Sequence, residues 1–187
     1  IACNKSKSAI RRFLYNEFRE DTNRQIDMLE APADTTPAKI RNTAMDLLTG
    51  REYSRAELAE KLNKRFDQHA AINDVLERLA EEGLQSDTRF AEAFVRSRLY
   101  RGHGLMRIRQ DIRQKGIAEE LITRTLDEAD VDWKHLAREV AQRKFGQRKA
   151  ADQREKAKRM RFLQYRGFNY DQIKFALAED VMEDDHY

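Results

Sequence analysis

The chain has 187 residues, of which 40% are hydrophobic and 37% charged, and its net charge is +3. Apolar residues this sparse indicate narrow stripes on amphipathic helices, and no apolar run approaches the roughly 20 residues that span a bilayer. The single cysteine, Cys3, excludes an intrachain disulfide and a cysteine-based zinc site. We therefore expect a soluble protein of a reducing compartment, the cytoplasm, with no signal peptide and no contact with a membrane.

Residues 1–37 lack the periodicity of the rest, and we expect an N-terminal extension that is disordered or not native to the protein. The two prolines, Pro32 and Pro37, both lie near this end, so no later residue breaks a helix by ring closure. The stretch PAKIRNTAMDLLTG then has apolar residues at helical spacing. Ser54, followed by Glu57, predicts a capping box that opens the next helix.

Two later segments, SDTRFAEAFVRSRLYRG and DVDWKHLAREVAQRKFG, show the same helical spacing, the first behind a Ser86 or Asp87 cap. Six glycines follow periodic runs at places where a helix often ends in a left-handed residue: Gly50, Gly83, Gly102, Gly116, Gly146 and Gly167. No convincing strand pattern occurs, so the predicted fold class is all-α.

An internal repeat is the strongest structural signal. The segment 107–126 aligns with 158–177 at an offset of 51 residues, and Gly116 matches Gly167. A weaker copy lies 50 residues upstream, where Phe66 occupies the position of the glycine. Self-similarity of this kind predicts stacked helical units. We expect three tandem three-helix repeats at about 38–83, 84–130 and 131–187, the last with an acidic tail, in an elongated, curved array.

The charge is unevenly distributed along the chain. From Arg138 to Arg166 eleven basic residues face three acidic ones, and from Asp87 to Gly116 eight face three. The C-terminus is acidic. This segregation favours an anionic partner over a merely solvated surface, although charged surface helices are the simpler alternative.

The sequence shows no pattern of an enzyme or a cofactor site. Gly102 and Gly104 begin like a dinucleotide-binding loop, but Arg107 stands where the third glycine is required, and no P-loop occurs. The four histidines, which lack metal-ligand spacing, are His69, His103, His135 and His186. The periodic phenylalanines are expected in the core. Three tyrosines flank basic residues and either pack or contact a partner: Tyr100, Tyr165 and Tyr170.

The stretch SDTRFAEAFVRSRLYRGHGLMRIRQDIRQKGI resembles the central motif of the RecX family, bacterial regulators of the RecA recombinase. DVDWKHLAREVAQRKFG and KAKRMRFLQYRGFNYDQI are also similar to the family, and the resemblance covers about Ala38 to Leu177. It implies tandem three-helix repeats and a binding function without catalysis. The implied partners are the RecA filament and its single-stranded DNA, with weak, sequence-independent binding to double-stranded DNA.

The resemblance further implies modulation, most often inhibition, of recombinase, ATPase and coprotease activities in DNA repair and the SOS response. We expect a monomer whose basic side chains meet DNA phosphates or acidic protein surface. The predicted contacts are Arg96, Arg98, Arg101, Arg107, Arg109, Arg113 and Lys115 in the second repeat, and Arg143, Lys144, Lys158, Arg159, Arg161 and Arg166 in the third.

Two other classes of function are open. A three-helix unit also suits a sequence-specific helix-turn-helix transcription regulator. The acidic segment AEELITRTLDE argues against it, because a recognition helix usually exposes polar and basic residues. A scaffold without nucleic acid is the third class, and the strongly basic segment disfavours it.

Overall fold

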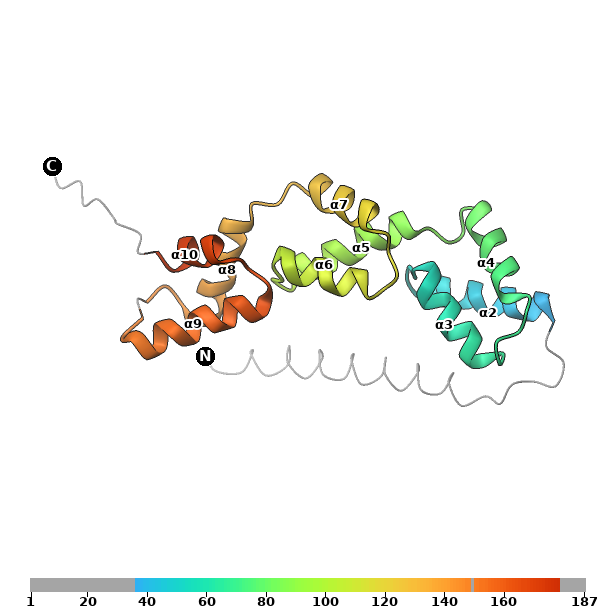
Figure 1. The fold of residues 1–187 in the computed structure, drawn as a ribbon, viewed down its shortest axis with the longest axis horizontal. Helices are drawn as coiled ribbons and strands as arrows, with labels where there is room; N and C mark the ends of the chain where they lie inside the picture. The colour runs from blue at the N-terminus through green and yellow to red at the C-terminus, as the bar shows by residue number, and fades with distance from the viewer. Residues whose placement is uncertain (1–35, 149, 179–187) are drawn as a thin grey trace, which may run out of the picture.

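The computed structural model describes residues 36–148 and 150–178, and over these ranges it contains nine α-helices and no strand. Figure 1 shows them as three consecutive groups of three along an elongated molecule. The predicted extension and acidic tail fall mainly outside these ranges. The main helix–helix packing lies within each group, and each group has its own hydrophobic core. The all-α, three-helix organisation is therefore confirmed.

The first group comprises α2 (Pro37–Gly50), α3 (Arg55–Arg65) and α4 (Ile72–Glu81). Thr36 caps α2 and a proline occupies its first turn, where a missing N–H removes no hydrogen bond. The buried core consists of Ile40, Ala44, Tyr53, Leu58, Leu62, Phe66, Ile72, Val75, Leu76 and Leu79.

The second group comprises α5 (Asp87–Tyr100), α6 (Leu105–Arg113) and α7 (Glu119–Glu128). Ser86 caps α5, as one of the two predicted alternatives, and its side chain accepts a hydrogen bond from the Arg89 N–H. The core consists of Phe90, Ala91, Val95, Ile108, Ile112, Ile117, Ile122 and Leu126.

The third group comprises α8 (Trp133–Phe145), α9 (Gln153–Arg166) and α10 (Tyr170–Leu177). Trp133 packs against the core of the second group, so α8 begins by bridging two units. The buried core of the third group consists of Ala137, Val140, Ala141, Leu163, Phe168, Ile173 and Ala176. Asn169 opens α10 with a full capping box that the sequence analysis did not predict.

Five of the six glycines expected at helix ends have positive φ, from 70° at Gly83 to 91° at Gly167. The expectation was wrong for Gly50, which is the last residue of α2 and does not have positive φ. The first group makes its turn after α3 differently, with Asp67 and Gln68 in the left-handed region. Phe66, just before them, is buried in the core of its own group.

The middle helices α3, α6 and α9 meet end to end. The start of α3 contacts the turn after α6, and the start of α6 contacts the end of α9. In this arrangement the carbonyl-rich end of one helix lies beside the N–H-rich start of another, so opposite partial charges are adjacent. We call the contact between α3 and α6 the first joint and that between α6 and α9 the second joint.

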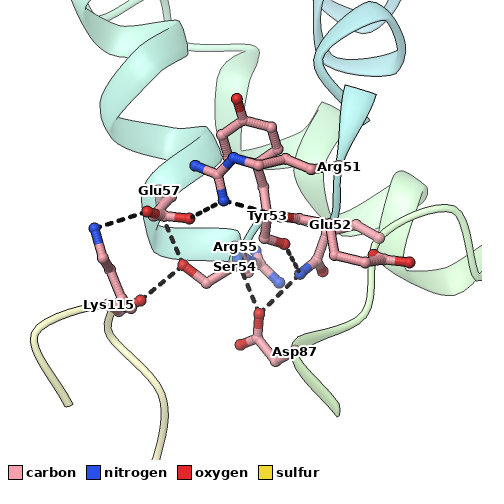
Figure 2. A network of polar contacts seen from close by, with 9 residues as sticks. Arg51, Glu52, Tyr53, Ser54, Arg55, Glu57, Asp87 and Lys115 are labelled. Carbon is pink, nitrogen blue, oxygen red and sulfur yellow. Dashed lines mark hydrogen bonds and ion pairs between the residues drawn. The ribbon is translucent and has the colours of Figure 1, made fainter. Parts of the chain in front are cut away.

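Side chains form the first joint (Figure 2). The Ser54 hydroxyl accepts a hydrogen bond from the Glu57 N–H and donates to the Lys115 carbonyl at 2.7 Å. The Lys115 ammonium lies 2.9 Å from the Glu57 carboxylate, which also pairs with Arg51. The predicted capping box is thus only half present, because Glu57 binds these two cations instead of reaching back to the backbone of Ser54.

A second set of contacts joins the same two groups at the start of α5. The Asp87 carboxylate accepts hydrogen bonds from the Arg55 N–H and the buried Gln85 amide, both at 2.8 Å. The Gln85 amide also donates to the Tyr53 carbonyl. Outside this set, Arg89 pairs with Glu52 at 2.9 Å. The first joint therefore consists of charged and polar side chains.

Backbone atoms form the second joint. The Gly104 N–H donates to the Arg166 carbonyl at 2.8 Å, and the Met106 N–H donates to the Gly167 carbonyl at 3.1 Å. The Arg166 guanidinium donates to the Arg101 carbonyl at 2.6 Å. A Cβ on Gly104 would lie only 2.5 Å from the Gly167 carbonyl atoms. The two groups approach this closely because both helix ends carry glycine.

The outer start of α9 makes no such joint among the described residues. Asp152 caps the helix by accepting a hydrogen bond from the Glu155 N–H, and the Glu155 carboxylate accepts one from the Ala151 N–H. This helix start is therefore capped by a side chain of its own segment.

Candidate partner and nucleic-acid interface

All thirteen predicted contact residues lie in the described ranges, and the structure divides them by their neighbours. Five are exposed and have no described carboxylate within ion-pair distance: Arg96, Arg101, Lys144, Lys158 and Arg161. Arg143 is also exposed, and its only described ionic neighbour is Glu139 at 3.8 Å. These six side chains are the ones most available to an external anion.

The arginines of α6 are held by two different neighbours. Arg109 and Arg113 pair with Glu119 at the start of α7, at 3.2 and 2.8 Å. Arg107 instead pairs with Asp111, and its guanidinium lies 5.5 Å from the centre of the Tyr165 ring. Arg107 therefore belongs to a different set of contacts from Arg109 and Arg113, while Ile108 and Ile112 of the same helix are buried in the core.

Asp111 faces two arginines and one histidine near the second joint. Its carboxylate lies 2.9 Å from Arg107, 3.5 Å from Arg98 and 4.0 Å from the His103 imidazole. Arg98 also lies over the Phe94 ring, with 4.7 Å between the guanidinium carbon and the ring centre. Because one carboxylate faces two guanidinium groups, this part of the surface keeps a net positive charge.

Two predicted contacts belong to the joints themselves. Lys115 lies in the first joint and Arg166 in the second, each just before the glycine that ends its helix region. Burial raises the pKa of Glu57, but the hydrogen bond and charge of Lys115, together with Arg51, outweigh it and lower the pKa of this carboxyl. The motif positions that carry the family resemblance thus hold neighbouring repeats together.

Arg159 is the one predicted contact that is buried, with 8% of its surface exposed. Its guanidinium pairs with Glu155 and donates to the Arg148 carbonyl at 2.7 Å. It also lies 5.2 Å from the centre of the Phe145 ring. These contacts fasten the segment before α9 to α8 and α9, and they leave little of the side chain for a partner.

A surface hollow of about 750 Å³ opens beside the second joint. Its lining contains four arginines, one histidine and two tyrosines: Tyr100, Arg101, His103, Arg107, Arg143, Tyr165 and Arg166. They come from the end of α5, the α5–α6 turn, α6, α8 and the end of α9, so the joint brings together residues that are far apart in the sequence. Only some were predicted as contacts.

His103 is the residue of this hollow that sequence reasoning missed, because its role was considered only for metal binding. Burial lowers the pKa of the imidazole, the charges of Arg98, Arg166 and Arg107 lower it further, and Asp111 acts in the opposite direction. Its buried Nδ1 has no hydrogen-bond partner in the described structure. His103 is therefore a neutral group in a cationic setting.

The exposed side of α7 has the opposite character. A shallow hollow there is lined by four acidic side chains, one threonine and one arginine: Glu119, Glu120, Thr123, Arg124, Asp127 and Glu128. This helix follows α6 as the second helix of a helix-turn-helix, the position from which bases are read. Its acidic surface would repel DNA phosphates.

Among the helices described, none combines the length and apolar character needed to cross a bilayer.

Three family models match the chain in order along its length. The models described as the first, second and third three-helix domains of RecX match residues 41–79, 86–126 and 134–177. These spans agree with the three helical groups seen in the structure.

Individual relatives and solved structures agree. Regulatory protein RecX of Halorhodospira halophila is 47% identical over 146 residues, which cover 78% of this chain and 91% of the relative. That of Pseudomonas fluorescens is 45% identical over 156 residues, 83% of this chain and 100% of the relative. A crystal structure of regulatory protein RecX has a TM-score of 0.66 at 24% identity, covering 76% of this chain and 73% of that one. The crystal structure of RecX from Lactobacillus salivarius has a TM-score of 0.63 at 22% sequence identity, and the match covers 75% of this chain and 94% of that one.

Proposed function

The chain belongs to the RecX family, and we propose that it regulates a RecA recombinase by binding the RecA filament on single-stranded DNA. In this proposal it limits filament growth and the ATP hydrolysis, strand exchange and coprotease activity that depend on the filament. It acts as a binding protein without catalysis of its own.

The observation that carries the proposal is the set of exposed cations on an elongated array. Arg96, Arg101, Lys144, Lys158 and Arg161 lie in the second and third groups and have no described carboxylate partner. Such side chains attract phosphates or acidic protein surface without reading base sequence. An elongated protein with contacts spread over two repeats could bridge neighbouring protomers of a filament and alter their addition and release.

The paired cations support the proposal less strongly. An external anion that binds Arg109 or Arg113 must compete with Glu119, whose carboxylate already pairs with both. Exchanging one ionic partner for another gains little free energy at a solvent-exposed site. We therefore give the unpaired side chains the larger share of the binding.

Sequence-specific DNA reading is the less favoured alternative. The acidic side of α7 faces outward where a recognition helix would enter the major groove. We expect weak binding to free DNA with a steep salt dependence and no preferred operator.

The test is a titration of RecA ATP hydrolysis on single-stranded DNA. The variant Arg96→Gln/Lys158→Gln/Arg161→Gln removes three unpaired cations. A control, Lys39→Gln/Lys64→Gln/Arg78→Gln, removes the same charge from exposed positions of the first group. The wild type and control should slow hydrolysis at similar concentrations, whereas the variant should need about tenfold more protein.

Glutamine is preferable to glutamate in this test. Glutamine removes the positive charge without adding a negative one, so a weaker effect on RecA reports the loss of a cation and not a new repulsion. Unchanged melting of both triple variants shows that they are folded. If a folded variant slows hydrolysis as the wild type does, the unpaired cations do not carry the interaction, and a wild type without effect on RecA contradicts the proposed function itself.

A further inference from the structure

We propose that the hollow at the second joint is a docking site for a short stretch of single-stranded nucleic acid, with a phosphate on its arginines and a base against its tyrosines. Residues of the second and third groups line the hollow, and Figure 1 shows these two groups as neighbours along the molecule. The inference deepens the proposed function, because it gives the single strand of the filament a specific place on this chain.

Two of the four arginines of the hollow, Arg107 and Arg166, are positioned before any ligand arrives. Arg166 donates to the Arg101 carbonyl at 2.6 Å, and Arg107 is fixed by Asp111 at 2.9 Å. Arg143 reaches the same hollow from α8, and its nearest described carboxylate, Glu139, is exposed and 3.8 Å away. A ligand phosphate would therefore meet arginines that lose little side-chain freedom on binding.

The tyrosines distinguish this hollow from an ordinary basic patch. Tyr100 is 81% exposed and Tyr165 is 75% exposed, whereas Tyr53 in the first group is only 6% exposed. Two large aromatic side chains left in water beside one hollow are available for stacking. The Arg107 guanidinium, 5.5 Å from the centre of the Tyr165 ring, helps to hold that ring at the edge of the site.

Cations and exposed aromatic rings together favour a nucleic-acid strand over an acidic peptide. A peptide carboxylate would use only the arginines and would leave both tyrosines exposed. An unpaired nucleotide offers a phosphate and an aromatic base within the same unit, and stacking accepts any base. A duplex would not offer its base faces, so the site should prefer single strands.

His103 provides an internal reporter of occupancy. It faces Arg98 from α5, Arg107 and Asp111 from α6, and Arg166 from the end of α9, and the first cause of its lowered pKa is burial. A phosphate entering the hollow adds negative charge and should raise the pKa of the imidazole. By linkage, the strand should bind more tightly as the pH falls through this raised pKa, because the complex takes up a proton.

The first experiment measures binding of fluorescein-labelled oligo(dT) of 15 nucleotides to the full chain, without RecA, by anisotropy. Tyr100→Ala and Tyr165→Ala should each weaken binding about fivefold or more, the lower end of one lost base–aromatic stack. Tyr170→Ala is the matched control, because this tyrosine is 64% exposed but lies outside the hollow. Equal affinities for all three variants and the wild type would overturn the inference.

The second experiment tests the phosphate contacts through the dependence of affinity on salt. Arg101→Gln/Arg143→Gln should reduce the slope of log affinity against log salt by about 1.4, since each contact to single-stranded DNA contributes about 0.7. Lys39→Gln/Lys64→Gln removes the same charge from the first group and should leave the slope unchanged. An unchanged slope in the hollow variant would place the phosphates elsewhere.

NMR of the His103 ring separates a strand from other anions. Oligo(dT) should raise its pKa and shift its signals at concentrations where inorganic phosphate and a poly-glutamate peptide do not. A response to the peptide and none to the oligonucleotide would assign the hollow to an acidic protein partner and overturn the inference. If oligo(dT) binds here and the chain does not affect RecA ATP hydrolysis, the site stands while the proposed function fails.

Discussion

The two joints solve the same structural problem with different chemistry. Both attach the start of one middle helix to the end of the next and both carry glycine there, but the first is bonded mainly through hydroxyl, carboxylate and ammonium side chains and the second mainly through backbone groups. Charged side chains respond to pH and salt, whereas a close backbone contact responds to added volume. The array should therefore loosen between different repeats under different perturbations.

The largest effect should come from adding volume at the second joint. Gly167 has φ of 91°, and a Cβ there would collide with the Arg107 backbone. Gly167→Ala combines left-handed strain with overpacking, and we expect a loss of about 2–4 kcal/mol in the free energy of unfolding. Urea titration followed by circular dichroism measures it.

Gly83→Ala separates the two causes of that loss. Gly83 also has positive φ, at 70°, but no atom lies within 4 Å of its added Cβ. Gly83→Ala should therefore lower the free energy of unfolding only through backbone strain, by about 1–2 kcal/mol. A loss as large as that of Gly167→Ala would show that volume at the second joint is unimportant.

A smaller effect is expected from added volume at the first joint. Gly116→Val should cost about 1–3 kcal/mol, because φ is 75° and a Cβ would lie 2.5 Å from the Ala56 Cβ. The colliding atom belongs to a short side chain that can be removed. In a double-mutant cycle, Ala56→Gly should recover part of the loss of Gly116→Ala. Purely additive losses would contradict the contact.

Loss of the Ser54 hydroxyl should cost about 1–2 kcal/mol. Ser54→Ala removes the cap of α3 and the hydrogen bond to the Lys115 carbonyl at a fully buried site. Ser86→Ala removes only the cap of α5, which is exposed, and should cost less. Thermal unfolding of both variants gives the comparison, and equal losses would mean that the inter-repeat bond contributes nothing.

The smallest effect should be the ionic one, and it should depend on pH. Glu57→Gln should cost about 0.5–1 kcal/mol at pH 7. The lowered pKa in the folded state means that the stabilisation is complete above about pH 4.5, the ordinary value, and is lost as the pH falls through the folded pKa. The difference from wild type in urea should therefore shrink as the pH falls below 4.5 and disappear below the folded pKa of Glu57.

Two further results check that assignment. The difference at pH 7 should shrink in 1 M salt, which screens exposed charges. Glu60→Gln, on the exposed side of the same helix, should change the stability little at either pH. A pH-independent loss in Glu57→Gln would indicate a packing defect instead of a lost ion pair.

Most of the fold could be predicted because it follows from local patterns. The spacing of apolar residues predicted the helices. The glycines at 116 and 167 revealed the repeat length, because both occupy left-handed turns at equivalent positions. The prediction of a left-handed conformation failed at Gly50, because nothing in the neighbouring sequence reveals that α2 ends directly in extended backbone at Arg51. A glycine after a helix is compatible with either ending.

The site was less predictable because its partners are distant in sequence. Charge counts indicated basic segments but could not show that Glu119 neutralises Arg113, or that Arg159 is buried. The hollow needs residues from the α5–α6 turn, α8 and the end of α9, which meet only through the second joint. No local pattern contains that information, and the predicted contacts themselves remain to be tested.

The middle helices contact one another head to tail, and a contact of this kind could in principle be repeated with further three-helix units or further molecules. A head-to-tail contact has two unlike halves, so each added unit presents a fresh half to the next. At the outer end of α3, however, Phe66 is buried in its own core where the joints carry glycine. At the outer start of α9, the Asp152 side chain caps the helix by accepting from the Glu155 N–H, and the Glu155 carboxylate accepts from the Ala151 N–H. Both outer helix ends are thus occupied by residues of their own segments, which disfavours end-to-end addition of molecules through this contact.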